Sequence, residues 1–106
     1  MLTKHDEMVV RAFRRRLQAI TPILDLRVYG SRARGDATPE SDLDIFIELE
    51  TVTPKLRQRI SEIAWEVGFD MDRVISTFVA TRKQMSSSAL AANPLLRHIE
   101  RDGVRV

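Results

Sequence analysis

The chain has 106 residues, 43% of them hydrophobic and 30% charged, which suits one domain over residues 1–106 better than two. It has no cysteine, which excludes a disulfide scaffold, a cysteine-based zinc finger, an iron–sulfur cluster and a cysteine nucleophile, and makes the cytoplasm the default compartment. The 17 basic and 15 acidic residues leave a net charge of +2, which does not by itself predict a nucleic-acid partner, and no apolar stretch is long enough for a signal peptide or a membrane span.

Helical and strand patterns alternate along the first half of the chain. Apolar residues fall at helical spacing from Thr3 to about Thr21, and Pro22 follows them as a stop signal. Apolar and polar residues then alternate from Leu24 to Tyr29, which is the period of a half-buried strand, and Gly30 ends it. A second strand is predicted from about Leu43 to Leu49.

The second half continues the alternation. A threonine cap and a first-turn proline at 53–54 begin a helix that we expect to end at Gly68. β-Branched and aromatic residues predict a third strand at 73–80, and two further helices are expected, one starting after Thr81 and one at 93–103. Strands interleaved with helices predict an α/β (α+β) fold, with a small mixed sheet of three to four strands and helices packed mainly on one face.

The segment Gly30-Ser31-Arg32-Ala33-Arg34-Gly35 forms the first part of a candidate site. Gly30 lets a bulky anion approach the backbone, and Ser31 offers an amide and a hydroxyl to phosphate oxygens. Residues 31–34 would form a short helical turn whose free N–H groups point at the same anion. Arg32 and Arg34 splay to different sides of such a turn, so we expect one of them to contact phosphate, and we weight Arg32 above Arg34.

Asp42 and Asp44 form the second part of the site. They are two apart on a predicted strand, so both carboxylates project from one face while Leu43 and Ile45 project into the core. Two adjacent carboxylates repel each other, and a divalent cation that prefers oxygen ligands, in cells Mg²⁺, relieves the repulsion. With a triphosphate bound at the Gly30-Ser31 segment, the predicted chemistry is phosphoryl or nucleotidyl transfer. The alternative is that the two acids are solvated charges on an edge strand.

Gly30-Ser31, ten residues and then Asp42-Leu43-Asp44 make the pattern G-S-x10-D-x-D. With this pattern the chain resembles the polymerase-beta-like nucleotidyltransferase superfamily, and the Gly-Ser-Arg-Ala-Arg-Gly run with Ser41 before the first aspartate is similar to its minimal nucleotidyltransferase branch. The resemblance implies that fold, phosphate binding by Gly30 and Ser31, and Mg²⁺ binding by Asp42 and Asp44. The full set of nucleotide-binding candidates is Gly30, Ser31, Arg32, Arg34 and Ser41.

The same resemblance implies a third carboxylate on a later strand, which in polymerising members activates the attacking hydroxyl. The middle of the third predicted strand has no acid near Ser76 or Phe78. Asp72 shares strand parity with these positions if the strand extends back that far, so it joins Ser31, Asp42 and Asp44 as a catalytic candidate. Otherwise activation falls to the substrate or to Glu48, or is absent.

Small members of this branch are often encoded beside a helical HEPN protein and act as antitoxins, some by adenylylating a tyrosine of that partner. The resemblance therefore implies ATP as the nucleoside triphosphate and a HEPN-type protein as acceptor. A chain of 106 residues leaves no room for a separate acceptor domain, so acceptor recognition needs a partner or a second copy in a homo-oligomer. One alternative is a catalytically degenerate module that neutralises a partner by contact, and another is transfer to RNA or an antibiotic.

Other conspicuous residues carry weaker signals. His5 and His98 have no ligand spacing and predict no metal site. The arginine run at 14–16 is read as a solvated helix face, because no aromatic residues are interleaved for stacking on nucleic acid. Trp65 lies beside the apolar stripe of its helix and is equally compatible with a core position and a partner-facing one.

Overall fold

The computed structural model describes residues 2–106, except for the side chain of Ser88. In this part of the chain one mixed sheet has the strand order β3-β2-β1-β4. Strand β2 is antiparallel to β1 and parallel to β3, and β4 adds to β1 in antiparallel fashion. The four strands are β1 (Asp25–Tyr29), β2 (Leu43–Leu49), β3 (Ile75–Thr81) and β4 (Val104–Arg105). The predicted α/β class with a small mixed sheet is confirmed.

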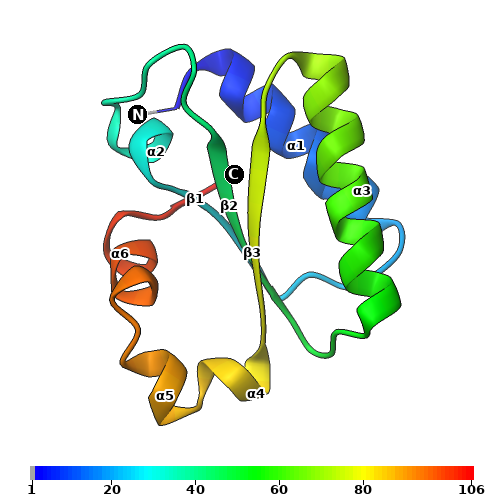
Figure 1. Ribbon diagram of the computed structural model, residues 1–106, viewed down its shortest axis with the longest axis vertical. Coiled ribbons are helices and arrows are strands. Elements are labelled where there is room, and N and C mark those ends of the chain that lie inside the picture. The colour runs from blue at the N-terminus through cyan, green and yellow to red at the C-terminus, as the bar shows by residue number, and fades with distance from the viewer. Residues whose placement is uncertain (1) are drawn as a thin grey trace.

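Two long helices, α1 (Lys4–Gln18) and α3 (Pro54–Met71), lie side by side on one face of the sheet (Figure 1). Alternate residues of β2 point into this layer, because one face of a strand carries every second side chain. The buried core there includes Phe13, Leu26, Ile45, Ile47 and Ile63. No helix among the described residues combines the length and the apolar composition needed to cross a membrane.

The opposite face of the sheet is covered in part by α6 (Pro94–Asp102), which the chain reaches through α4 (Arg82–Met85) and α5 (Ser88–Ala91) (Figure 1). A second, smaller core forms here from Phe46, Ala80, Leu96 and Ile99. Phe46 lies between Asp44 and Glu48 on this face of β2, so α6 covers the middle of the strand while Asp44 stays near its start.

Helix α3 does not end at Gly68, as predicted, but at Met71, with Asp72 as a left-handed C-cap at φ 59°. A Cβ atom on Gly68 would lie 2.3 Å from the carbonyl oxygen of Arg73. The Arg73 N–H also donates to the Gly68 carbonyl, at 2.9 Å. Gly68 therefore allows the chain entering β3 to approach the helix closely, a tertiary requirement that looks like a helix stop in the sequence.

Candidate active site

Gly30 joins the end of β1 to the short helix α2 (Ser31–Arg34), as the sequence predicts. Its φ of 79° lies in the region that favours glycine. A Cβ atom on Gly30 would lie 2.5 Å from Oδ2 of Asp44, so the backbone at the Gly30-Ser31 bend touches that carboxylate. The two parts of the predicted site therefore meet in space, through Gly30 and Asp44, which are 14 residues apart in the chain.

The pairing of β1 with β2 explains why Asp44 reaches the bend. Asp44 lies opposite Tyr29, the last residue of β1, and Asp42 comes just before β2 begins at Leu43. Burial raises the pKa of Asp44, and the negative charge of Asp42 raises it further, while the Arg34 guanidinium opposes both effects. Burial and the charge of Asp44 also raise the pKa of the Tyr29 phenol. Asp44 is thus a half-buried acid whose ionised form is disfavoured by the negative charge of Asp42.

These two carboxylates are a suitable start for a magnesium site. Carboxylate oxygens are the ligands Mg²⁺ takes from proteins, usually one or two of them, with water and substrate phosphate completing the shell. Mutual repulsion of the pair makes cation binding favourable. Within residues 2–106, no group of three or more His, Cys, Asp or Glu side chains could hold a metal ion, so the described donor set is Asp42 and Asp44 alone.

The position of the expected third carboxylate is filled by Ser76, which lies opposite Asp44 in the β2–β3 register. The parity argument for Asp72 fails, because β3 starts at Ile75 and Asp72 has a left-handed backbone. Asp72 instead lines a hollow together with Glu40 and Ser41. Glu48 is on the face of Asp44 but four residues along the strand, about 13 Å away along the backbone.

Arg32, which the sequence favours as the phosphate contact, and Arg34 differ in burial and in their hydrogen-bond partners. The Arg32 side chain is buried, and its Nε and Nη2 donate to the carbonyl of Ser41 at 3.0 and 2.8 Å. Its Nη1 donates to the buried Asp6 carboxylate at 3.4 Å. Arg32 therefore holds the loop before Asp42 from inside. Arg34 is exposed and close enough to Asp44 to affect its pKa, so it is the cation next to the carboxylates.

Ser41 takes part in the same loop. Its Oγ accepts from the backbone N–H of Thr38 at 2.9 Å, and its carbonyl accepts from Arg32. Ser41 thus shapes the turn that leads to Asp42. The Asp6–Arg32 contact could not be predicted from the sequence, because 26 residues separate the partners and the capping box that Asp6 forms with Thr3 gives no indication of Arg32.

Solved structures with the same fold are distant in sequence. A chain of a toxin-antitoxin with AMP-PNP superposes with a TM-score of 0.63 at 18% identity, over 94% of this chain and 70% of the other. A chain of a mutant of the toxin-antitoxin MntA-HpeT gives 0.60 at 15% identity, over 94% and 70%. A chain of the tri-AMPylated Shewanella oneidensis HEPN toxin in complex with MNT antitoxin gives 0.54 at 16%, over 95% and 67%.

A search of curated proteins found no match. The family model of the nucleotidyltransferase domain matches residues 10–99, which is most of the chain and includes the Gly30-Ser31 bend, the Asp42–Asp44 pair and all of β3. On this match, and with the fold shared by the solved structures, the chain belongs to the nucleotidyltransferase domain family.

Proposed function

We propose that this nucleotidyltransferase uses Mg²⁺ to transfer AMP from ATP to a hydroxyl group of a HEPN-type partner protein, as the antitoxin of a toxin–antitoxin pair. The observation that carries the proposal is the contact between the Gly30 backbone and the Asp44 carboxylate, with Asp42 beside it. A phosphate-binding bend and a pair of mutually repelling carboxylates at one place are what transfer of a nucleotide requires.

In the proposed reaction, the acceptor oxygen forms a bond to the α-phosphorus of ATP, and the bond from that phosphorus to the pyrophosphate oxygen breaks. The backbone at Gly30 and Ser31 would bind the phosphates, and Asp42 and Asp44 would hold Mg²⁺. When bound, Mg²⁺ supplies charge neutralisation at the phosphate oxygens. Arg34 would add positive charge on the same side. The acceptor proton passes to water, since the described residues offer no third carboxylate beside the pair.

Two of the structural neighbours support the choice of nucleotide and partner. One is a toxin-antitoxin with AMP-PNP, and another contains a HEPN toxin that is AMPylated, in complex with an MNT antitoxin. Both share the fold of this chain at under 20% identity. An adenine nucleotide and a helical HEPN-type acceptor are therefore the first substrates to test.

The test is to incubate the full chain with α-labelled ATP, Mg²⁺ and a purified HEPN-type protein, and to measure label that stays attached to the acceptor after denaturation. We expect covalent label from the unmodified chain and at least a ~100-fold lower rate from Asp44→Asn, because one of two ligands to the proposed metal is lost. Glu62→Gln, an exposed change on α3, is the matched control and should retain the rate. Equal rates from the unmodified chain and Asp44→Asn would contradict the proposal.

The second candidate is a degenerate module that binds its partner without transferring a nucleotide. The observation that favours it is Ser76 at the position expected for an acid. On this alternative, the chain neutralises the HEPN-type protein equally well without ATP, and no label appears on the acceptor, on RNA or on an antibiotic. Neutralisation that requires ATP would exclude this candidate.

A further inference from the structure

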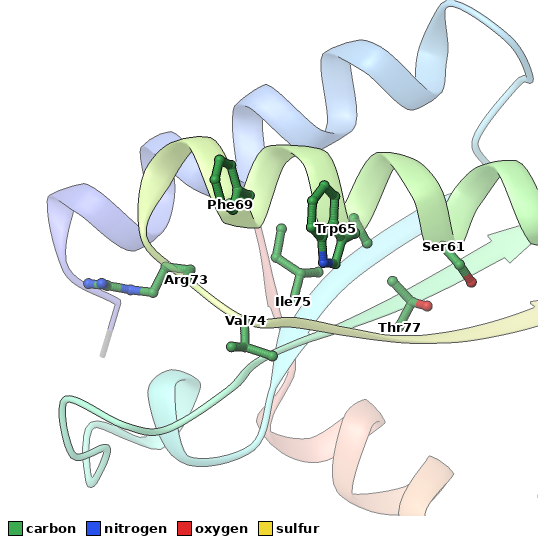
Figure 2. Close-up of a pocket in the computed structure, with 8 residues that line it drawn as sticks. Ser61, Trp65, Phe69, Arg73, Val74, Ile75 and Thr77 are labelled. Atoms are coloured by element: carbon green, nitrogen blue, oxygen red, sulfur yellow. The ribbon is translucent and has the colours of Figure 1, made fainter.

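An aromatic patch lies exposed beside the edge of the sheet, on the face opposite Asp44. Trp65 and Phe69 of α3 are 69% and 75% exposed, and their rings stack at 5.3 Å with an interplanar angle of 15°. Val74, 65% exposed, extends the patch to the start of β3. Figure 2 shows these side chains around a pocket of about 370 Å³, with Ile75 and Thr77 of β3 beside them. Exposed apolar clusters of this kind mark interaction surfaces.

The strand beside the patch has a free edge. β3 is the last strand of the sheet on its side, and Val74 accepts a hydrogen bond from Leu43 at 2.8 Å. Backbone groups in a parallel ladder alternate in direction, so every second residue after Val74 also faces β2. The N–H and C=O groups of Ile75, Thr77 and Val79 therefore point outward.

This edge lacks the features that usually prevent strands from pairing. Its seven residues, Ile75–Thr81, include no charged residue, no proline and no glycine. Natural edge strands are commonly protected by lysine, proline or a bulge. An unprotected edge next to an exposed aromatic patch is suited to receiving another strand.

We propose that the occupant is a second copy of this chain, which pairs its own β3 antiparallel to the first across a two-fold axis at Thr77. This register places Thr77 opposite itself and Ile75 opposite Val79, so all three outward-facing residues find partners. The two sheets become one continuous sheet, and both α3 helices lie on the same face, where Trp65 and Phe69 of the two copies meet.

Charge at the ends of β3 favours a second copy over an unrelated strand. Asp72 and Arg82 lie just outside the two ends of β3, so antiparallel pairing brings the acidic end of one copy near the basic end of the other, and the two-fold axis creates this proximity twice. Arg73, which would otherwise add a like charge, is held by the Asp6 carboxylate of its own chain at 3.0 Å. Arg82 is 66% exposed and has only a long contact to Glu50, at 3.9 Å, so it can turn toward a new partner.

The first experiment measures molar mass by sedimentation equilibrium, without nucleotide, so that its outcome is independent of transferase activity. We expect a dimer, and a dissociation constant at least ~30-fold higher for Trp65→Ser/Phe69→Ser, since central aromatic anchors carry most of the binding in such interfaces. Met8→Ser removes another exposed apolar side chain, from α1, and should leave the constant unchanged. Thermal melting confirms that each variant is folded.

The second experiment tests the register and uses the absence of cysteine from the chain. A hydrogen-bonded antiparallel pair separates its Cα atoms by ~5.5 Å, within the range of a disulfide. Thr77→Cys should therefore form a covalent dimer under mild oxidation, whereas Met8→Cys should not. Arg82→Asp should weaken the dimer about tenfold, and Asp72→Arg/Arg82→Asp should restore it.

A chain that stays monomeric at about 100 µM, with no disulfide from Thr77→Cys, would overturn the proposal. So would a dimer that Trp65→Ser/Phe69→Ser leaves intact. A monomer whose aromatic variant binds the acceptor protein more weakly would assign the surface to the acceptor and reject the second copy.

Discussion

At the scale of single residues, the site depends on the absence of a side chain at Gly30. Replacing it by alanine adds a Cβ atom 2.5 Å from the Asp44 carboxylate, at a φ of 79° that L-residues adopt at a cost. We expect Gly30→Ala to lower the free energy of unfolding by about 1–3 kcal/mol in urea denaturation and to weaken ATP binding more than tenfold in calorimetry.

Gly35→Ala is the control for this change, because Gly35 has a similar φ of 87°. It should show the loss of stability that backbone strain causes and keep most of the ATP affinity. If both variants lost affinity equally, strain and not displacement of Asp44 would explain the result.

The second residue-scale prediction concerns the charge of Asp44. Its pKa in the fold is raised, so the folded state prefers the protonated form, and stability falls as the pH rises through the folded pKa. At pH 7 the ionised carboxylate therefore costs stability. We expect Asp44→Asn to have a higher Tm than the unmodified chain at pH 7 without Mg²⁺, and the difference to shrink below about pH 4.

Magnesium should reverse the order of the two Tm values, so that the unmodified chain becomes more stable than Asp44→Asn. On the proposed assignment Mg²⁺ binds the folded chain through Asp42 and Asp44, so adding it should raise the Tm of the unmodified chain and leave that of Asp44→Asn nearly unchanged. A Tm increase of equal size in both proteins would show that the ion binds elsewhere.

The residues of the candidate site could be predicted from the sequence only where their spacing determines their position in the fold. The proximity of Gly30, Asp42 and Asp44 could be predicted because a strand end, a ten-residue interval and a period of two determine where their groups go. The roles of Arg32 and Arg34 could not be assigned, because they depend on which arginine meets Asp6 from a distant helix. Sequence spacing indicates on which face of a strand or helix a side chain lies, whereas its interaction partner depends on tertiary contacts.

At the scale of elements, strands and helices followed the hydrophobic periodicity closely. β2 matches its predicted range of 43–49, and capping residues begin α3 and α6 where expected. The helix end at Gly68 was wrong because glycine serves two purposes that look alike in a sequence, a helix stop and a close approach. The two-residue strand β4 is too short to leave a periodic signal.

The close approach at Gly68 can be measured. Glycine to alanine inside a helix usually stabilises a protein by about 0.5–1 kcal/mol. Here the new Cβ atom would meet the backbone oxygen of Arg73 at 2.3 Å, which a backbone shift must relieve. We expect Gly68→Ala to lower the free energy of unfolding by about 1–3 kcal/mol in urea denaturation. Ser61→Ala, at an exposed position of α3, should be neutral or slightly stabilising, and a stabilising Gly68→Ala would refute the close contact.

At the scale of the whole molecule, one buried carboxylate connects three distant segments. Asp6 at the start of α1 accepts from Arg73, ahead of β3, at 3.0 Å and from Arg32 of α2 at 3.4 Å. Because Arg32 also holds the carbonyl of Ser41, this group links the α1–α3 layer to the loop that carries Asp42. Sequence separations of 26 and 67 residues left no local pattern from which to predict the link.

The charge of Asp6 should therefore control both acid stability and the site. Burial alone would raise its pKa, but the hydrogen bond from Arg73, the Thr3 backbone and the charge of Arg32 together lower it. A lowered pKa means that the stabilisation is present above the unfolded pKa of about 4 and is lost as the pH falls through the folded value. Asp6→Asn should lower the free energy of unfolding at pH 7 by about 3 kcal/mol, because Arg32 loses its buried counter-charge.

The difference in the free energy of unfolding between Asp6→Asn and the unmodified chain should become smaller as the pH is lowered below about 4, because the Asp6 carboxylate of the unmodified chain is then also neutralised. Urea denaturation at pH 7 and pH 3 measures it, and Asp36→Asn, which removes an exposed ion pair with Arg34, should change stability by less than about 1 kcal/mol at either pH. A gap that stayed constant with pH would mean that Asp6 contributes through packing alone. In that case the carboxylate would not be what ties the Asp42 loop to the body of the protein.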